Sequence, residues 1–79
     1  MLLPQIPEGT ALRILGFTGS RRLRRDLAQM GIHIGDIVHV HRHVPFGGPT
    51  LLEHRGTKVA VGRSLAERIR VEQVSSELP

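Results

Sequence analysis

The chain has 79 residues, a formal net charge of +4 and no cysteine. A chain of this length forms one domain that buries only about 60% of the surface its unfolded form exposes, which leaves no room for a large active-site cleft. The lack of cysteine excludes disulfides, thiolate metal sites and cysteine-based catalysis, and it predicts a cytoplasmic protein. The positive charge favours an acidic protein, a nucleic acid or an anionic membrane surface as partner.

An irregular arm is expected over residues 1–8, because Pro4 and Pro7 interrupt regular structure there. The arm has neither the basic region nor the apolar length of a signal peptide or a membrane span, so no membrane insertion is expected. One domain then occupies residues 9–74, and residues 75–79 are expected to fray at the C-terminus.

Residues 10–17 have the alternating pattern of a strand. A short amphipathic helix is expected next, with Ser20 as its N-cap and Gly31 as its C-terminal stop. The apolar residues of both elements recur at the spacing of a buried face and are expected in the core: Leu12, Ile14, Phe17, Leu23, Leu27 and Met30.

Alternating patterns predict four more strands, over residues 37–43, 51–54, 58–61 and 69–74. Gly56 and Thr57 have the character of a two-residue hairpin loop of type II′, in which glycine comes first. Ser64 and Glu67 have the spacing of a capping box, which predicts a helical turn before the last strand. Five short strands with one short N-terminal helix predict a mainly β fold, a small closed or partly open barrel.

The loop over residues 44–49 is expected to be rigid, because prolines and glycines surround its one aromatic residue: Pro45, Gly47, Gly48 and Pro49. Phe46 is therefore a candidate anchor for a partner, since a rigid loop presents an aromatic side chain at low entropic cost. In the alternative interpretation, Phe46 folds back and caps the end of the barrel.

The predicted helix begins with four closely spaced arginines: Arg21, Arg22, Arg24 and Arg25. Cations in the first turn oppose the helix dipole, at a cost of a few tenths to about 1 kcal/mol each, so they do not serve helix stability. Arg21, Arg22 and Arg25 are candidate partner-binding residues for an acidic patch, lipid headgroups or a phosphate. The alternative is a basic face that is simply solvated.

Three histidines, His39, His41 and His43, alternate with valines and are expected on one face of a strand. Two neighbouring imidazoles could share a transition metal, and His54, His33 or Glu53 could complete the site. The alternative is an exposed polar face. No required cofactor is expected, only an adventitious or regulatory divalent transition metal.

Five segments, taken together, resemble the ferrous iron transport protein A (FeoA) family over residues 9–74: LAQMGI (27–32), GDIV (35–38), PFGGP (45–49), VAV (59–61) and AERIRV (66–71). The resemblance implies an SH3-like barrel that works in the cytoplasm as an accessory protein of ferrous iron uptake. It implies docking on, and modulation of, the cytoplasmic part of a FeoB-type membrane GTPase permease, which would recruit the protein to the inner face of the membrane. The three histidines depart from the usual family pattern.

Two other functions stay open, a small metal-binding or metal-sensing protein that uses the histidines, and a basic nucleic-acid-binding module. Nucleic acid is not the expected partner, because the chain has no tryptophan or tyrosine and only two phenylalanines for base stacking. A second copy of the chain is another candidate partner. No enzyme activity is expected, because no spacing of serine, histidine and acidic residues indicates a catalytic site.

Overall fold

The computed structural model describes residues 1–19 and 21–74. The predicted N-cap Ser20 and the predicted fraying of residues 75–79 lie outside these ranges. In chain order the elements are η1 (Leu3–Gln5), β1 (Ala11–Phe17), α1 (Arg21–Gln29), β2 (Ile37–His43), β3 (Thr50–His54), β4 (Thr57–Val61), α2 (Arg63–Ala66) and β5 (Ile69–Val74). No helix in these ranges is long and apolar enough to span a membrane.

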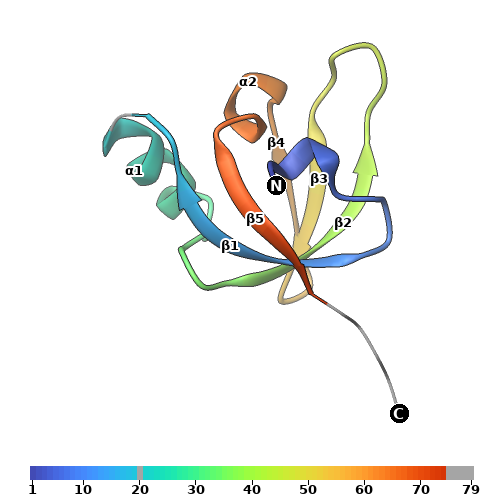
Figure 1. Ribbon diagram of the computed structural model, residues 1–79, viewed down its shortest axis with the longest axis horizontal. Helices are drawn as coiled ribbons and strands as arrows, with labels where there is room; N and C mark the ends of the chain where they lie inside the picture. Colours follow the sequence, from blue (N-terminus) through green and yellow to red (C-terminus); the bar gives the residue numbers. More distant parts are fainter. Residues whose placement is uncertain (20, 75–79) are drawn as a thin grey trace.

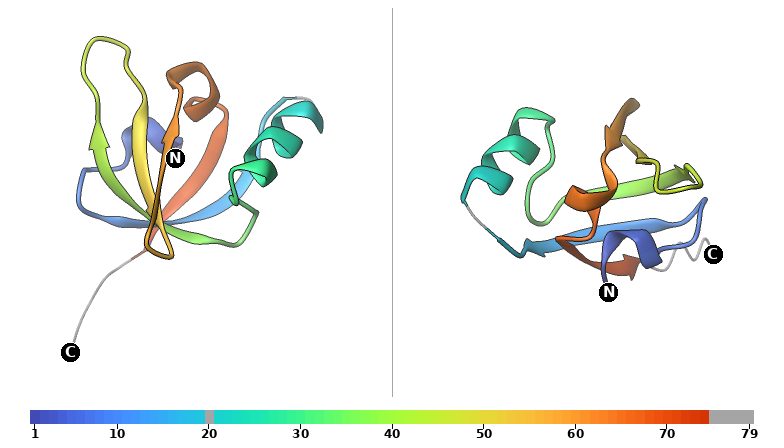
Figure 2. Two further views of the ribbon diagram at one scale, coloured as in Figure 1. Left: turned by 180° about the vertical axis from the view of Figure 1, so that it is seen from behind. Right: turned by 90° about the horizontal axis from the view of Figure 1, so that it is seen from above.

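The five strands form one antiparallel, strongly curved sheet in the order β4-β3-β2-β1-β5 (Figure 1). This confirms the predicted mainly β fold, in its partly open form, because β4 and β5 are the two edges of the described sheet. Helix α1 lies at one side of the sheet and the loop between β2 and β3 at the other, as all three views show (Figures 1 and 2).

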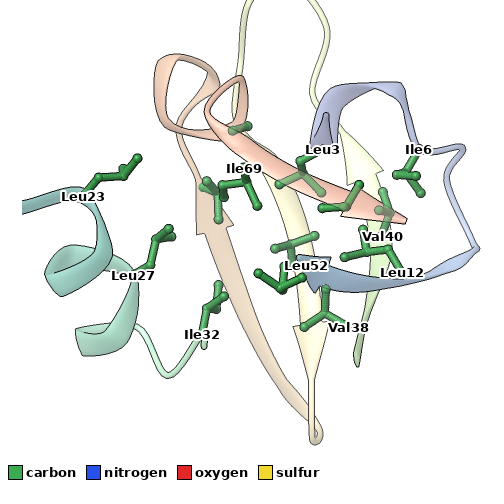
Figure 3. Close-up of a cluster of buried hydrophobic side chains, with 14 residues drawn as sticks. Leu3, Ile6, Leu12, Leu23, Leu27, Ile32, Val38, Val40, Leu52 and Ile69 are labelled. Atoms are coloured by element: carbon green, nitrogen blue, oxygen red, sulfur yellow. The ribbon is translucent and has the colours of Figure 1, made fainter. Parts of the chain in front are cut away.

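The core lies on the concave face of the sheet, where Leu12 and Ile14 are buried as predicted. The other buried strand residues on this face are Val38, Val40, Leu52, Val61, Ile69 and Val71. Helix α1 adds Leu23 and Leu27, which point from the helix towards the strands (Figure 3). Burial of a large aliphatic side chain contributes about 1.5 to 3 kcal/mol, so these few residues supply most of the stability of the domain.

Helix α1 ends at Gln29, and Gly31, two residues on, has a φ of 84°, which fits the predicted glycine stop after a helix. The N–H of Ile32 donates to the carbonyl of Leu27 (2.9 Å) and the N–H of Gly31 to that of Ala28 (2.9 Å), the hydrogen bonds of a Schellman motif. This reversal carries Ile32 into the core and leaves Met30 38% exposed. The prediction that Met30 is a core residue is therefore wrong.

The predicted irregular arm over residues 1–8 is instead an ordered part of the core. It contains the single turn η1, and Leu3 and Ile6 are essentially inaccessible to solvent. Both side chains belong to the cluster of buried residues in the core, and Figure 3 shows Ile6 near Val40. The physical reason is that the sheet is not closed, so its concave face needs apolar side chains from outside the strands.

Two local predictions differ from the structure in detail. The hairpin loop between β3 and β4 consists of Arg55 and Gly56, with φ values of 53° and 81°, which is the pattern of a type I′ turn and not of a type II′ turn at Gly56 and Thr57. The helical turn α2 is present, but its N-cap is Gly62 and not Ser64, so the predicted capping box does not form.

The buried arm leads to a prediction about stability. Ile6→Ala should lower the free energy of unfolding by about 2 to 5 kcal/mol, because it leaves a cavity under the open side of the sheet. Ile37→Ala, at a position that is 44% exposed, is the matched control and should change it by no more than about 0.5 kcal/mol. Urea denaturation measures both, and equal effects would contradict a structural role for the arm.

The hairpin gives a second prediction. Arg55→Asn should stabilise the protein by some tenths to about 1 kcal/mol, because asparagine tolerates a positive φ better than arginine and is favoured in type I′ turns. Gly56→Ala should destabilise it, because a Cβ is strained at a φ of 81°. Thermal unfolding of the two variants should show shifts of opposite sign, and shifts of the same sign would exclude this turn type.

Candidate functional site

The loop between β2 and β3 is a tight structure with Phe46 at its tip. The N–H of Val44 donates to the carbonyl of Pro49 (2.9 Å) at the base of the loop, and the N–H of Gly48 donates to the carbonyl of Pro45 (3.3 Å) nearer the tip. A Cβ on Gly48 would lie 2.5 Å from a Val44 methyl carbon, so the loop closes this tightly only because residue 48 is glycine.

Phe46 is fully exposed and has a φ of 60°. The alternative in which Phe46 folds back over the barrel is therefore wrong. A residue other than glycine in this left-handed region costs roughly 1 to 2 kcal/mol. The loop thus holds an aromatic ring in water at a strained backbone position, and neither feature contributes to the stability of the isolated chain.

The four arginines of α1 are all exposed, as predicted, and no acidic residue lies in the first turn of the helix. They lie on the other side of the sheet from the β2–β3 loop (Figure 2). The predicted partner-binding residues therefore form two separate surfaces, one around Phe46 and one around Arg21, Arg22 and Arg25.

The three histidines of β2 do not share one face. The register between β2 and β3 shifts at His41, which is a β-bulge, so Val40 pairs with Leu52 but Arg42 pairs with Leu51. Beyond the bulge, His43 pairs with the buried Thr50 and lies on the concave side of the sheet. The prediction of a three-histidine face is wrong for His43.

Both ring nitrogens of His43 are engaged within the protein. Nε2 lies 2.6 Å from the carbonyl oxygen of Ile6, which can only accept, so Nε2 carries the proton. Nδ1 lies 2.9 Å from the Thr50 hydroxyl, and the backbone N–H of His43 donates to the Glu8 carboxylate (2.7 Å). His43 therefore joins the arm to the base of the Phe46 loop and has no nitrogen free for a metal.

The other candidate ligands are divided between two places. His39, His41 and Glu53 line one open hollow of about 280 Å³. His33 and His54 lie instead beside Asp36, whose Oδ2 is 3.6 Å from His33 Nδ1 and 3.7 Å from His54 Nε2. Within residues 1–19 and 21–74, no three side chains of the metal-binding types form a group that could hold a metal ion.

The sequence does not reveal the residues that fix the base of the Phe46 loop through His43, namely Ile6, Glu8 and Thr50. Ile6 and Glu8 reach His43 from far along the chain, and nothing in the sequence of the arm signals this contact. The site as a whole offers an aromatic ring, a rigid backbone and a basic face. Groups of these kinds are common at protein–protein interfaces.

The chain matches a family model described as the FeoA domain over residues 1–73. It is similar to a crystal structure named iron uptake regulatory protein (FeoA), with 26% identity, a TM-score of 0.85, and coverage of 94% of this chain and 97% of that one. A FeoA-like protein from Clostridium acetobutylicum is 24% identical over 100% of this chain and 92% of its own, with a TM-score of 0.83.

A more distant likeness extends only to the fold. The manganese regulator SloR is 20% identical, with a TM-score of 0.83 over 94% of this chain, but the match covers only 34% of the regulator. No curated protein matches the chain.

The position of His43 gives a prediction that separates a structural histidine from exposed ones. His43→Phe should lower the free energy of unfolding by about 1 to 3 kcal/mol for each polar group left without a partner. His41→Phe, at an exposed position of the same strand, should change it by about 0.5 kcal/mol or less. Urea denaturation at neutral pH measures both changes. An equally small effect at the two positions would refute a structural role for the hydrogen bonds of His43.

Proposed function

Because this chain belongs to the FeoA domain family, we propose that it serves ferrous iron transport as a small, non-enzymatic accessory protein. It works in the cytoplasm and docks on the cytoplasmic part of a FeoB-type membrane GTPase permease, which it modulates. Docking brings it to the inner face of the membrane without inserting it. The family match over residues 1–73 supports the role in iron transport, and the geometry of the Phe46 loop supports the docking.

The single observation that carries the docking proposal is the combination of strain and full exposure at Phe46. Strained backbone positions persist where the surrounding structure enforces them, and they concentrate at functional sites. Fully exposed aromatic rings that become buried on association dominate the binding energy of many interfaces. A loop that is already rigid loses little entropy on binding. Most of the free energy gained by burying Phe46 therefore contributes to the affinity.

The rest of the loop supports the ring and shapes what it can enter. Pro45, Gly47, Gly48 and Pro49 leave the tip narrow, with the Phe46 ring as its one large apolar group. The matching site on the permease is therefore a small apolar pocket rather than a flat surface. The net charge of +4 adds long-range attraction to an acidic partner and speeds the encounter.

The alternative of a small metal-binding or metal-sensing protein has less support. The main argument for this function is a strand face with three histidines. His43 does not belong to that face, because it lies on the other side of the sheet with both ring nitrogens engaged. Only His39 and His41 remain exposed on this strand, with Glu53 half-buried beside them. Two imidazoles without a fixed third ligand bind a metal weakly.

Phe46→Gly tests the docking proposal. The variant should bind the cytoplasmic part of the permease about 30-fold more weakly or worse, the loss expected for an interface hot spot. It should also unfold at the same or a higher temperature than the wild type, because glycine relieves the strain at a φ of 60°. Binding to the immobilised cytoplasmic part of the permease measures the affinity, and thermal unfolding measures the unfolding temperature.

Phe46→Tyr is the matched control, because it keeps the ring and the strained backbone. It should bind more tightly than Phe46→Gly, because the ring is kept and only a hydroxyl is added to it. If Phe46→Gly binds as well as the wild type while both stay folded, the loop is not the docking element. A wild-type chain that does not bind the permease domain at low salt would refute the docking itself.

A further inference from the structure

Two neighbouring hollows lie along one side of α1, and the proposed function uses neither. A hollow of about 220 Å³ near the start of the helix is lined by Phe17, Gly19, Arg21 and Arg24. A second hollow of about 190 Å³, lined by Phe17, Arg24, Ala28, Ile32, His33 and Ile34, continues it towards the loop after the helix. Phe17 and Arg24 line both hollows, so the two lie side by side, and we call them together the α1 groove.

The two ends of the α1 groove have different chemistry. Arg21, Arg24 and Ala28 follow one stripe along the helix, so the groove is basic near the helix start and becomes apolar towards the helix end. Ile34, which is 49% exposed, extends the apolar end beyond the helix. Half-buried Phe17 forms the floor between the two ends.

The charge of the groove is not neutralised from within. Of the described residues, no carboxylate lies within salt-bridge distance of Arg21 or Arg24, whereas Arg13 and Arg63 are paired with Glu72 and Glu67. Neighbouring cations at the helix start raise the energy of the free protein, because they repel each other and oppose the helix dipole. An anionic partner group at this end would relieve both effects.

We propose that the α1 groove binds a peptide segment of a partner protein in which acidic side chains are followed closely by aliphatic ones. The carboxylates pair with Arg21 and Arg24, where arginine can bind them through two parallel hydrogen bonds. The aliphatic side chains cover the exposed Ala28 and Ile34, above the buried Ile32. A nucleic acid backbone matches only the basic end, because its phosphates bring no apolar groups to Ala28 and Ile34.

This inference goes beyond docking through Phe46 and does not rest on it. Helix α1 and the β2–β3 loop lie at different sides of the sheet in every view (Figures 1 and 2). None of the residues that line the groove belongs to the loop. Loss of one binding surface therefore leaves the other intact, and the two can be tested separately.

The test measures fluorescence anisotropy of the full chain with a short labelled peptide that carries a run of glutamates followed by a run of leucines. Two reference peptides replace the glutamates by glutamine or the leucines by serine. The acidic–aliphatic peptide should bind at least about ten-fold more tightly than either reference, because both ends of the groove contribute.

Two variants and one matched control locate the site. Arg24→Glu should weaken binding about ten-fold or more, and Ile34→Ser should weaken it several-fold. Arg22→Glu changes the net charge equally but lines a different hollow, with Leu65 and Arg68, so it should weaken binding by about two-fold or less at physiological salt. Phe46→Gly should leave peptide binding unchanged.

Three outcomes would overturn the proposal. Equal losses in Arg24→Glu and Arg22→Glu would mean that only the overall positive charge attracts the peptide. Equal binding of the serine reference peptide would remove the role of the apolar end. Self-association of the free chain that Ile34→Ser abolishes, detected by sedimentation, would assign the groove to a second copy instead.

Discussion

The extra residue that β2 carries at His41 sets the geometry on which the exposed loop depends. Without the bulge, strand alternation would place His43 on the convex face beside His39. With it, His43 turns inward, donates to the carbonyl of Ile6 and contacts the Thr50 hydroxyl. One irregular position therefore connects the arm, the strand that leads into the loop and the strand that leaves it.

This connection explains how a small domain can hold a strained loop. The Phe46 loop begins directly after His43 and ends directly before Thr50, so both of its ends are fixed by the same hydrogen-bonded pair. The arm contributes as well, because Leu3 and Ile6 fill the open side of the sheet and Glu8 binds the His43 backbone. Strain of roughly 1 to 2 kcal/mol at the tip is a large share of the stability of so small a domain, so the base must be rigid.

The sequence predicted those features that follow from local periodicity. Alternation identified Val38 and Val40 as buried, and helical spacing identified Leu23 and Leu27, because each pattern depends only on the geometry of its own element. Gly31 was recognisable as a helix stop, since a positive φ after a helix strongly favours glycine.

The features that were missed depend on contacts distant in the chain or on atypical residues. The bulge at His41 arises from pairing with β3, and no residue type within β2 marks it. Arginine is atypical at the first position of a type I′ turn, so Arg55 concealed the true position of the hairpin loop. The prolines of the arm predict irregular structure, whereas the open side of the sheet that the arm fills cannot be recognised in the sequence.

Two binding surfaces at different sides of one small body have a consequence that neither has alone. None of the residues that line the α1 groove belongs to the Phe46 loop, so either surface can be occupied while the other is free. If both are occupied at once, they must be held by separate segments of one partner or by two different partners. In the first case, binding at one surface raises the effective concentration of the second segment, so two weak contacts can give strong attachment. In the second case the domain acts as a bridge, and its rigidity fixes the distance between the two partners.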